Sequence, residues 1–276
     1  MTDKELDAPF VSVTGVLNFR DIGGYPIPSQ PGKEVRRGLV YRSSAPSQTI
    51  AVGYEKMQQL RIATIYDLRS YTELSTSERA SCGGGSMLIK TIPVPIFRDE
   101  DYAPEAEAVI LRFKTYKDRP EGFAEGYMGV LAAAAHSKNE ARPYASILEH
   151  LALSDDPQPM LIHCRHGKDR TAIICALILS LCGVEDEVVA YEYSLSDTGL
   201  ASLHNQLVAK LLLKQAYQED PKAAKQMVRT RKENMLYFLK KLKEEYGSVE
   251  QCVVDLKLLT SEGIGRLRTN MIKPCT

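Results

Sequence analysis

Hydrophobic and polar positions along the chain follow two different spacings. Short apolar runs that end in polar or turn residues are typical of buried strands, and such runs occupy residues 39–43, 64–68, 87–95 and 160–162. Elsewhere apolar residues recur every three or four positions, as in helices with one buried face, over residues 50–60, 127–135, 142–153, 171–181 and 184–195. Strands alternating with helices predict an α/β fold, with a central, mostly parallel sheet and helices on both faces.

The remaining segments are assigned more coarsely. Residues 10–17 alternate weakly between apolar and polar, which favours a strand, whereas residues 200–276 show helical spacing alone and predict a helical C-terminal third with leucine stripes in its core. Residues 97–126 mix charged and aromatic side chains, a composition typical of a lid or substrate-recognition insert and equally compatible with a plain surface helix. Nothing in the sequence reads as a linker, so we expect a single domain over residues 1–276.

The stretch from Pro159 to Thr171 contains the candidate catalytic residues. An apolar run ends at His163 and Cys164, and five residues separate Cys164 from Arg170, after which a helical apolar pattern begins. A strand that delivers a cysteine into a tight loop before a helix can curl its backbone N–H groups inward around an anion. Gly167 in the middle of the loop allows the positive φ or the close approach that such curling needs.

This arrangement suits a phosphate group and an ionised cysteine. The following helix directs its N-terminal dipole at the loop, and such a site can lower a cysteine pKa from about 8.5 to roughly 3.5–7.5. Arg170 supplies a planar fork that matches two phosphate oxygens. The competing interpretation of Cys164 is a small apolar residue at a strand end, which does not account for the glycine and the arginine that follow.

The loop sequence HCRHGKDRT (163–171) resembles the phosphate-binding loop of cysteine-dependent phosphatases. Further stretches, NFRDIGGY (18–25), RGLVYRSS (37–44), YDLRSYTE (66–73) and EYGSVE (245–250), are similar to the tyrosine-phosphatase-like family of bacterial and fungal proteins, which includes protein-tyrosine and phosphoinositide phosphatases. The resemblance implies hydrolysis of phosphomonoesters through a phosphocysteine intermediate, with Cys164 as nucleophile. From the residues alone, Arg20 and Asp21 would be simple surface groups, whereas the resemblance suggests a structural role, such as holding the loop from beneath.

The resemblance suggests Asp169, inside the loop, as the general acid that protonates the leaving oxygen. Asp99 is the competing candidate, because it follows a predicted strand and precedes a loop that we expect to be mobile, the location that dual-specificity phosphatases use. We prefer Asp169, since the loop itself would hold it near the phosphate. An ion pair between Asp169 and Lys168 or Arg170 is the alternative to a catalytic role.

The other loop residues are expected to bind phosphate or substrate. Arg165, His166 and Lys168 make the loop cationic, which favours substrates with more than one phosphate or with further acidic groups. Gly167 would shape the loop, and Thr171 would donate its hydroxyl to the thiolate while capping the helix. Expected substrates are phosphotyrosine proteins, and also phosphoserine or phosphothreonine proteins, phosphoinositide headgroups or small phosphomonoesters.

Composition narrows the class of protein. The 276 residues are 44% hydrophobic and 25% charged, and 35 basic residues balance 35 acidic ones, so no global field favours nucleic acid or an anionic membrane. Six cysteines without metal-ligand spacing favour a reducing compartment and no metal or other cofactor. Neither a secretory signal nor a transmembrane run is evident, so we expect a cytoplasmic protein. The sequence leaves the oligomeric state open.

Three other interpretations stay open at this point. The chain could act on a small metabolite phosphate, or it could be a silent phosphate-binding module, although all three of Cys164, Asp169 and Arg170 are present. A rhodanese-like or arsenate-reducing thiol protein could use a similar loop but would be expected to lack Asp169. Arsenate reduction would also need a second, resolving cysteine, and Cys175 fits a core position better.

Overall fold

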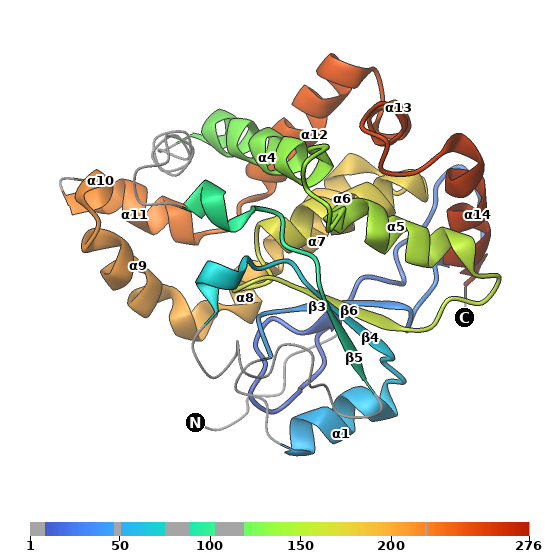
Figure 1. The fold of residues 1–276 in the computed structure, drawn as a ribbon, viewed down its shortest axis with the longest axis horizontal. Coiled ribbons are helices and arrows are strands. Elements are labelled where there is room, and N and C mark those ends of the chain that lie inside the picture. Colours follow the sequence, from blue (N-terminus) through green and yellow to red (C-terminus); the bar gives the residue numbers. More distant parts are fainter. Residues whose placement is uncertain (1–8, 47–50, 75–88, 103–118, 219, 276) are drawn as a thin grey trace.

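The fold is built on a central sheet. The computed structural model describes residues 9–46, 51–74, 89–102, 119–218 and 220–275 (Figure 1). The sheet has the order β1-β3-β6-β4-β5, with β1 at Arg20–Asp21, β3 at Val40–Ser43, β4 at Thr64–Asp67, β5 at Lys90–Pro93 and β6 at Met160–His163. β1 runs antiparallel to β3 and the other pairs are parallel. The predicted mostly parallel sheet is therefore confirmed.

Strand β6 lies at the centre and is buried on both faces. Met160 and Ile162 pack into a large core with Val40, whereas Leu161 packs into a second core with Ile65. The alternation follows from the two-residue period of a strand. The pairing register places Ser43, His163 and Asp67 side by side, so the carboxyl ends of β3, β6 and β4 form one edge.

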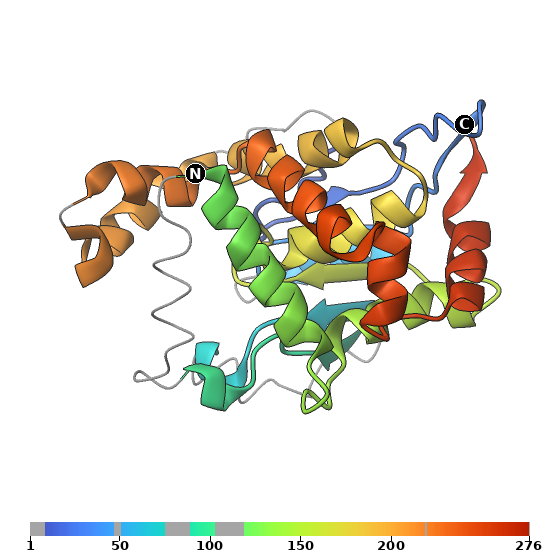
Figure 2. The ribbon, with the colours of Figure 1, turned by 90° about the horizontal axis from the view of Figure 1, so that it is seen from above.

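Helices cover both faces, as predicted, but unequally. Those that contribute to the large core are α4 (Pro120–Ala135), α5 (Pro143–Leu153), α6 (Arg170–Leu181), α7 (Asp186–Ser194), α12 (Lys232–Tyr246), α13 (Val249–Asp255) and α14 (Ser261–Met271). On the opposite face of the sheet, α1 (Ala51–Gln59) and residues 11–19 pack around the second core (Figure 1). Seen from above, α4 and α12 run side by side (Figure 2).

Helix α6 is the centre of the large core. Every residue from Thr171 to Leu181 except Ser180 is buried, which explains its all-apolar sequence. It ends at Leu181 with Cys182 in the C-cap position, and Gly183 follows with a φ of 88°, the left-handed conformation that glycine tolerates at helix ends. Cys175 is fully buried, and burial raises its pKa to about 12, which confirms its assignment to the core.

The C-terminal third is mostly helical. It continues with α8 (Ser196–Gly199), the 3-10 helix η3 (Ala201–Leu203), α9 (His204–Leu212), α10 (Gln215–Gln218) and α11 (Pro221–Val228). Helices α9 to α11 project from one end of the molecule (Figures 1 and 2) and pack on a small cluster of their own around Tyr217. The leucine stripe of α9 is therefore only half-buried, contrary to the expectation of core, whereas Met235 and Leu239 of α12 are fully buried as predicted.

Three expectations about individual elements need correction. Residues 10–17 form no strand but isolated bridges, with Phe10 opposite Arg20. The chain's last described residues include β7 (Ile272–Pro274), which pairs antiparallel with β2 (Lys33–Val35), so the C-terminal third is not wholly helical. Within residues 97–126, 103–118 lie outside the described residues, and Pro120 already begins α4, whose Phe123 is in the core.

Two short 3-10 helices complete the described structure, η1 (Tyr71–Glu73) and η2 (Asp99–Tyr102). η1 follows β4, and η2 follows β5, so both lie near the edge formed by the carboxyl ends of the parallel strands. No helix in the described part of the chain is long and apolar enough to cross a bilayer.

Candidate active site

Cys164 follows directly after the central strand β6, and its side chain is buried, with 3% of the residue exposed. Helix α6 begins at Arg170, with Asp169 in the N-cap position. The predicted succession of strand, loop and helix is confirmed. Since unpaired N–H groups at a helix N-terminus favour negative charge, the loop from Cys164 to Asp169 lies where an anion is stabilised.

Gly167 brings the loop into contact with strand β3. Its φ is 62°, and a Cβ atom at this position would lie 2.0 Å from the carbonyl oxygen of Ser43. No side chain fits there without displacing backbone. The expectation that the loop needs glycine for a positive φ and a close approach is confirmed on both counts.

Hydrogen-bond donors hold the carbonyl groups of the loop from one side. Asn18 Nδ2 donates to the carbonyl oxygens of His166 (3.1 Å) and Gly167 (3.3 Å), and Arg42 Nη2 donates to that of Gly167 (2.6 Å). In a trans peptide the C=O and the following N–H point in opposite directions. The N–H groups of Gly167 and Lys168 therefore face away from Asn18 and Arg42, as an anion-binding loop requires.

A buried charge cluster supports these donors. Glu192 of α7 accepts from Arg20 Nε at 2.7 Å and from Arg42 Nη1 at 2.6 Å, and the three side chains are at most 2% exposed. Burial alone would raise the pKa of Glu192, but the two guanidinium groups outweigh it and hold the pKa below its usual value. Arg20 Nη1 also donates to Asn18 Oδ1 at 2.5 Å, so Arg20 supports the loop from beneath through Asn18.

Asp21, the neighbour of Arg20, contacts a different part of the chain. Its carboxylate accepts from the backbone N–H groups of Gly23 (2.8 Å) and Gly38 (2.6 Å). It therefore joins the turn after β1 to the start of β3, a structural role that lies outside the phosphate loop.

Arg170 is oriented by a carboxylate that sequence reasoning did not single out. Glu73 of η1 accepts from Arg170 Nη1 at 2.5 Å and from Nη2 at 2.8 Å, a bidentate pair that fixes the plane of the guanidinium. Glu73 is held in turn by the backbone N–H of Ser70, which donates to Oε2 at 3.0 Å. The sequence signal that could have identified Glu73 is the Ser-x-x-Glu spacing of a capping box at residues 70–73.

The two candidate general acids have different surroundings. Asp169 Oδ1 accepts from the Tyr127 hydroxyl at 2.7 Å and lies 3.8 Å from the Lys168 ammonium, the ion pair expected as the alternative to a catalytic role, and the Asp169 side chain is 30% exposed. Asp99 accepts from the backbone N–H of Thr72 at 2.9 Å, so it joins η2 to η1. Asp169 belongs to the loop itself, whereas Asp99 makes a structural hydrogen bond to η1, the element that carries Glu73.

Comparison with known proteins gives the family. A model of the tyrosine phosphatase family matches residues 11–273. The chain belongs to the tyrosine phosphatase family. A protein named "Putative tyrosine-protein phosphatase" from Cupriavidus necator is 27% identical over 71% of this chain and 66% of its own length. The triple specificity protein phosphatase PtpB of Mycobacterium tuberculosis is 26% identical over 68% of this chain and 70% of its own. These matches support a phosphatase, and they span about two thirds of each relative.

The cationic character predicted for the loop of this family member is partly wrong. His166 is neutral near pH 7, because burial, together with Lys168, lowers its pKa to about 4. The Lys168 ammonium donates to the carbonyl oxygens of Met227 (2.6 Å) and Val228 in α11, so it ties the loop to the projecting helices. Arg165 is exposed, and its Nη2 donates to the Glu73 carbonyl oxygen at 2.7 Å. Substrate contacts by these three residues stay predictions.

Thr171 and His163 flank the loop on either side. Thr171 lies inside α6, so its predicted capping role is wrong. Its buried hydroxyl has no hydrogen-bond partner among the residues that the structure describes, so the predicted donation to Cys164 is wrong as well. His163 Nδ1 lies 3.1 Å from the Cys164 carbonyl oxygen and 3.7 Å from Asp67 Oδ1, and burial lowers its pKa. A neutral His163 that hydrogen-bonds the loop agrees with the orienting role that we expected.

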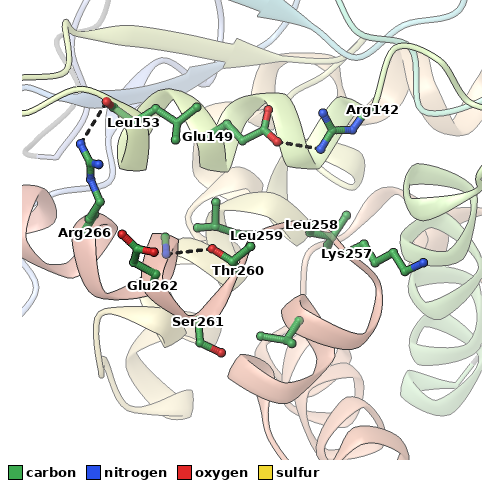
Figure 3. Close-up of a pocket in the computed structure, with 12 residues that line it drawn as sticks. Arg142, Glu149, Leu153, Lys257, Leu258, Leu259, Thr260, Ser261, Glu262 and Arg266 are labelled. Carbon is green, nitrogen blue, oxygen red and sulfur yellow. Dashed lines mark hydrogen bonds and ion pairs between the residues drawn. The ribbon is translucent and has the colours of Figure 1, made fainter.

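Two further observations delimit the site. Over the described residues, no group of three or more His, Cys, Asp or Glu side chains is arranged to hold a metal ion. A cavity of about 560 Å³ lies between α5 and the segment from α13 to α14, where Arg142 pairs with Glu149 and Arg266 donates to the Leu153 carbonyl oxygen (Figure 3). None of the predicted catalytic residues lines this cavity, so it is separate from the candidate active site.

Proposed function

We propose that this protein hydrolyses phosphomonoesters through a phosphocysteine intermediate, with Cys164 as nucleophile, Arg170 as phosphate ligand and Asp169 as general acid. The observation that carries the proposal is the loop between β6 and α6, in which Asn18 and Arg42 bind the carbonyl groups from one side. The amides on the other side then suit the equatorial oxygens of a phosphoryl group. Family membership and the names of the relatives support the same class of reaction.

In the first step, the Cys164 thiolate attacks phosphorus. An S–P bond forms, the P–O bond to the leaving group breaks, and the leaving oxygen takes a proton from Asp169. Arg170 binds two phosphoryl oxygens, and Glu73 keeps its guanidinium in the required plane. A positioned acid accelerates such a step by about 10²–10⁴-fold when the leaving alkoxide is poor.

In the second step, water attacks phosphorus, the S–P bond breaks and inorganic phosphate leaves. Asp169 now accepts a proton from the attacking water, so the enzyme returns to its starting protonation state. The same loop amides and Arg170 stabilise the charge in both steps, because the phosphoryl oxygens keep their positions while the apical groups exchange.

The preferred substrates are phosphotyrosine proteins. The relative named a putative tyrosine-protein phosphatase supports this choice. Because the mycobacterial relative is named a triple specificity protein phosphatase, we keep phosphoserine and phosphothreonine proteins as further candidates. Phosphoinositides and small phosphomonoesters come next. The location that we propose is the cytoplasm, and we propose that one domain over residues 1–276 carries the activity.

The test is a phosphate-release panel without added metal, with phosphotyrosine and phosphoserine peptides, phosphoinositides and small phosphomonoesters as substrates. Cys164→Ser should reduce turnover by about 10³-fold or more, as loss of a nucleophile does. Asp169→Asn should reduce turnover of alkyl phosphates by about 10²-fold or more and that of activated aryl phosphates far less. If the wild-type protein hydrolyses nothing in the panel but binds phosphopeptide, it is a binding module. If Asp99→Asn shows the leaving-group effect instead, Asp99 is the acid.

A further inference from the structure

Tyr127 touches the proposed general acid from outside the phosphate loop. It lies on α4, its side chain is fully buried, and its hydroxyl donates to Asp169 Oδ1 at 2.7 Å. Edge-to-face contacts hold the ring against Phe123, Tyr193 and Phe238, with ring centroids 5.8–6.2 Å apart. Because three helices contribute these rings, the hydroxyl oxygen of Tyr127 has one position relative to the loop.

A second tyrosine sets the direction of the hydrogen bonds. The Tyr193 hydroxyl lies 2.8 Å from that of Tyr127, and Asn234 Nδ2 donates to it at 3.5 Å. Since the proton of Tyr127 is donated to Asp169, Tyr193 must donate to Tyr127. The result is a one-way chain from Asn234 through Tyr193 and Tyr127 to Asp169, in which each bond polarises the next.

We propose that Tyr127 is a positioning residue for the general acid, assisted by Tyr193. The inference rests on the proposed function, in which Asp169 donates the proton. Because Oδ1 accepts the hydrogen bond from Tyr127, the acidic proton has to be on Oδ2. Rotation of the carboxyl group would break the bond to Tyr127, so Oδ2 is held in one direction for delivery of the proton to the leaving oxygen.

A purely structural role for Tyr127 makes a different prediction. Loss of packing would disturb the loop as a whole and would slow all substrates alike. Loss of orientation at Asp169 affects only the part of the rate that depends on proton donation, which grows as the leaving group becomes more basic. The dependence of the rate on the leaving group therefore separates the two roles.

The experiment measures kcat/KM of Tyr127→Phe for a series of alkyl and aryl phosphates. We expect a loss of about tenfold on alkyl phosphates, the cost of one hydrogen bond to a carboxyl group, and of less than about threefold on activated aryl phosphates. Tyr193→Phe should show the same pattern with a smaller loss, because it removes the next bond in the chain. Tyr66→Phe is the matched control, since its hydroxyl contacts His150 at 3.1 Å, and it should leave the series unchanged.

A double-mutant cycle with Asp169→Asn completes the test. If Tyr127 acts through Asp169, Tyr127→Phe costs nothing further in the Asp169→Asn background. Equal losses on all substrates, or additive losses in the cycle, would overturn the inference while leaving the proposed function intact. An Asp169→Asn variant without leaving-group dependence would instead overturn the acid assignment, and the role of Tyr127 with it. Should Tyr127→Phe fail to fold, Tyr193→Phe decides, and an equal loss on all substrates overturns the inference.

Discussion

Replacing Glu192 by glutamine tests how far the buried charge cluster stabilises the fold. Glu192 is the anion between Arg20 and Arg42, and all three side chains are at most 2% exposed. Glutamine keeps the shape and one acceptor oxygen but removes the negative charge. Two guanidinium groups would then face each other in the interior without a counter-charge, which is a costly arrangement.

The magnitude follows from the contacts. Each charge-assisted hydrogen bond from Arg20 (2.7 Å) and Arg42 (2.6 Å) contributes about 1.5–3 kcal/mol, and glutamine can replace one of them in weakened form. Breaking a buried ion pair by removing one partner costs about 3–5 kcal/mol. We therefore expect the free energy of unfolding of Glu192→Gln to fall by about 3 kcal/mol or more at pH 7.

Urea unfolding followed by circular dichroism measures this free energy. Glu250→Gln is the matched control, because Glu250 pairs with Arg268 at 2.6 Å but its side chain is 44% exposed, and exposed pairs contribute less than about 1 kcal/mol. The contribution of Glu192 to wild-type stability should also fade in acid. Because the fold lowers the pKa of Glu192, this stabilisation is fully present above the unfolded pKa near 4.3 and is lost as the pH falls through the folded pKa. A loss in Glu192→Gln no larger than in Glu250→Gln would refute the reasoning.

Three further substitutions test the loop. Gly167→Ala places a Cβ 2.0 Å from the Ser43 carbonyl oxygen, so phosphatase activity should fall by about tenfold or more, and unchanged activity would contradict the contact. Glu73→Gln weakens the fork that orients Arg170, so KM for aryl phosphates should rise by about tenfold, whereas a pure kcat effect would speak against this role. Burial lowers the pKa of His166 to about 4, against about 6.5 in the unfolded chain, so the free energy of unfolding should fall by about 2 kcal/mol as the pH is lowered from 7 to 5. His166→Gln should abolish this fall in urea titrations.

Local sequence was sufficient to predict the strand, the loop and the helix around Cys164. The apolar run of β6 is buried on both faces, and α6 is apolar all round, so each element matches its environment without information from distant residues. Gly167 was predictable for the same reason, since its φ of 62° is a local property. The start of α4 at Pro120, before the predicted start at residue 127, could also have been predicted, because proline is favoured in the first turn of a helix.

The partners of the loop were not predictable from local sequence. Glu73 contacts a residue 97 positions away, Asn18 one 148 positions away and Glu192 one 172 positions away. A glutamate on a helix looks the same in the sequence whether it faces solvent or two buried arginines. The same holds for Tyr127, whose contact with Asp169 arises from the packing of α4 beside the N-terminus of α6.

The charges beneath the loop agree with the proposed binding of an anion. Arg20 and Arg42 with Glu192 carry a net charge of +1, from two cations and one anion, and Arg20 stays protonated at neutral pH although burial lowers its pKa to about 10. Burial alone would lower the pKa of Arg42, yet attraction to Glu192 outweighs burial and raises the pKa. The cluster therefore fixes the loop carbonyl groups, and its uncompensated positive charge favours the anionic phosphoryl group that we propose for the opposite side of the loop.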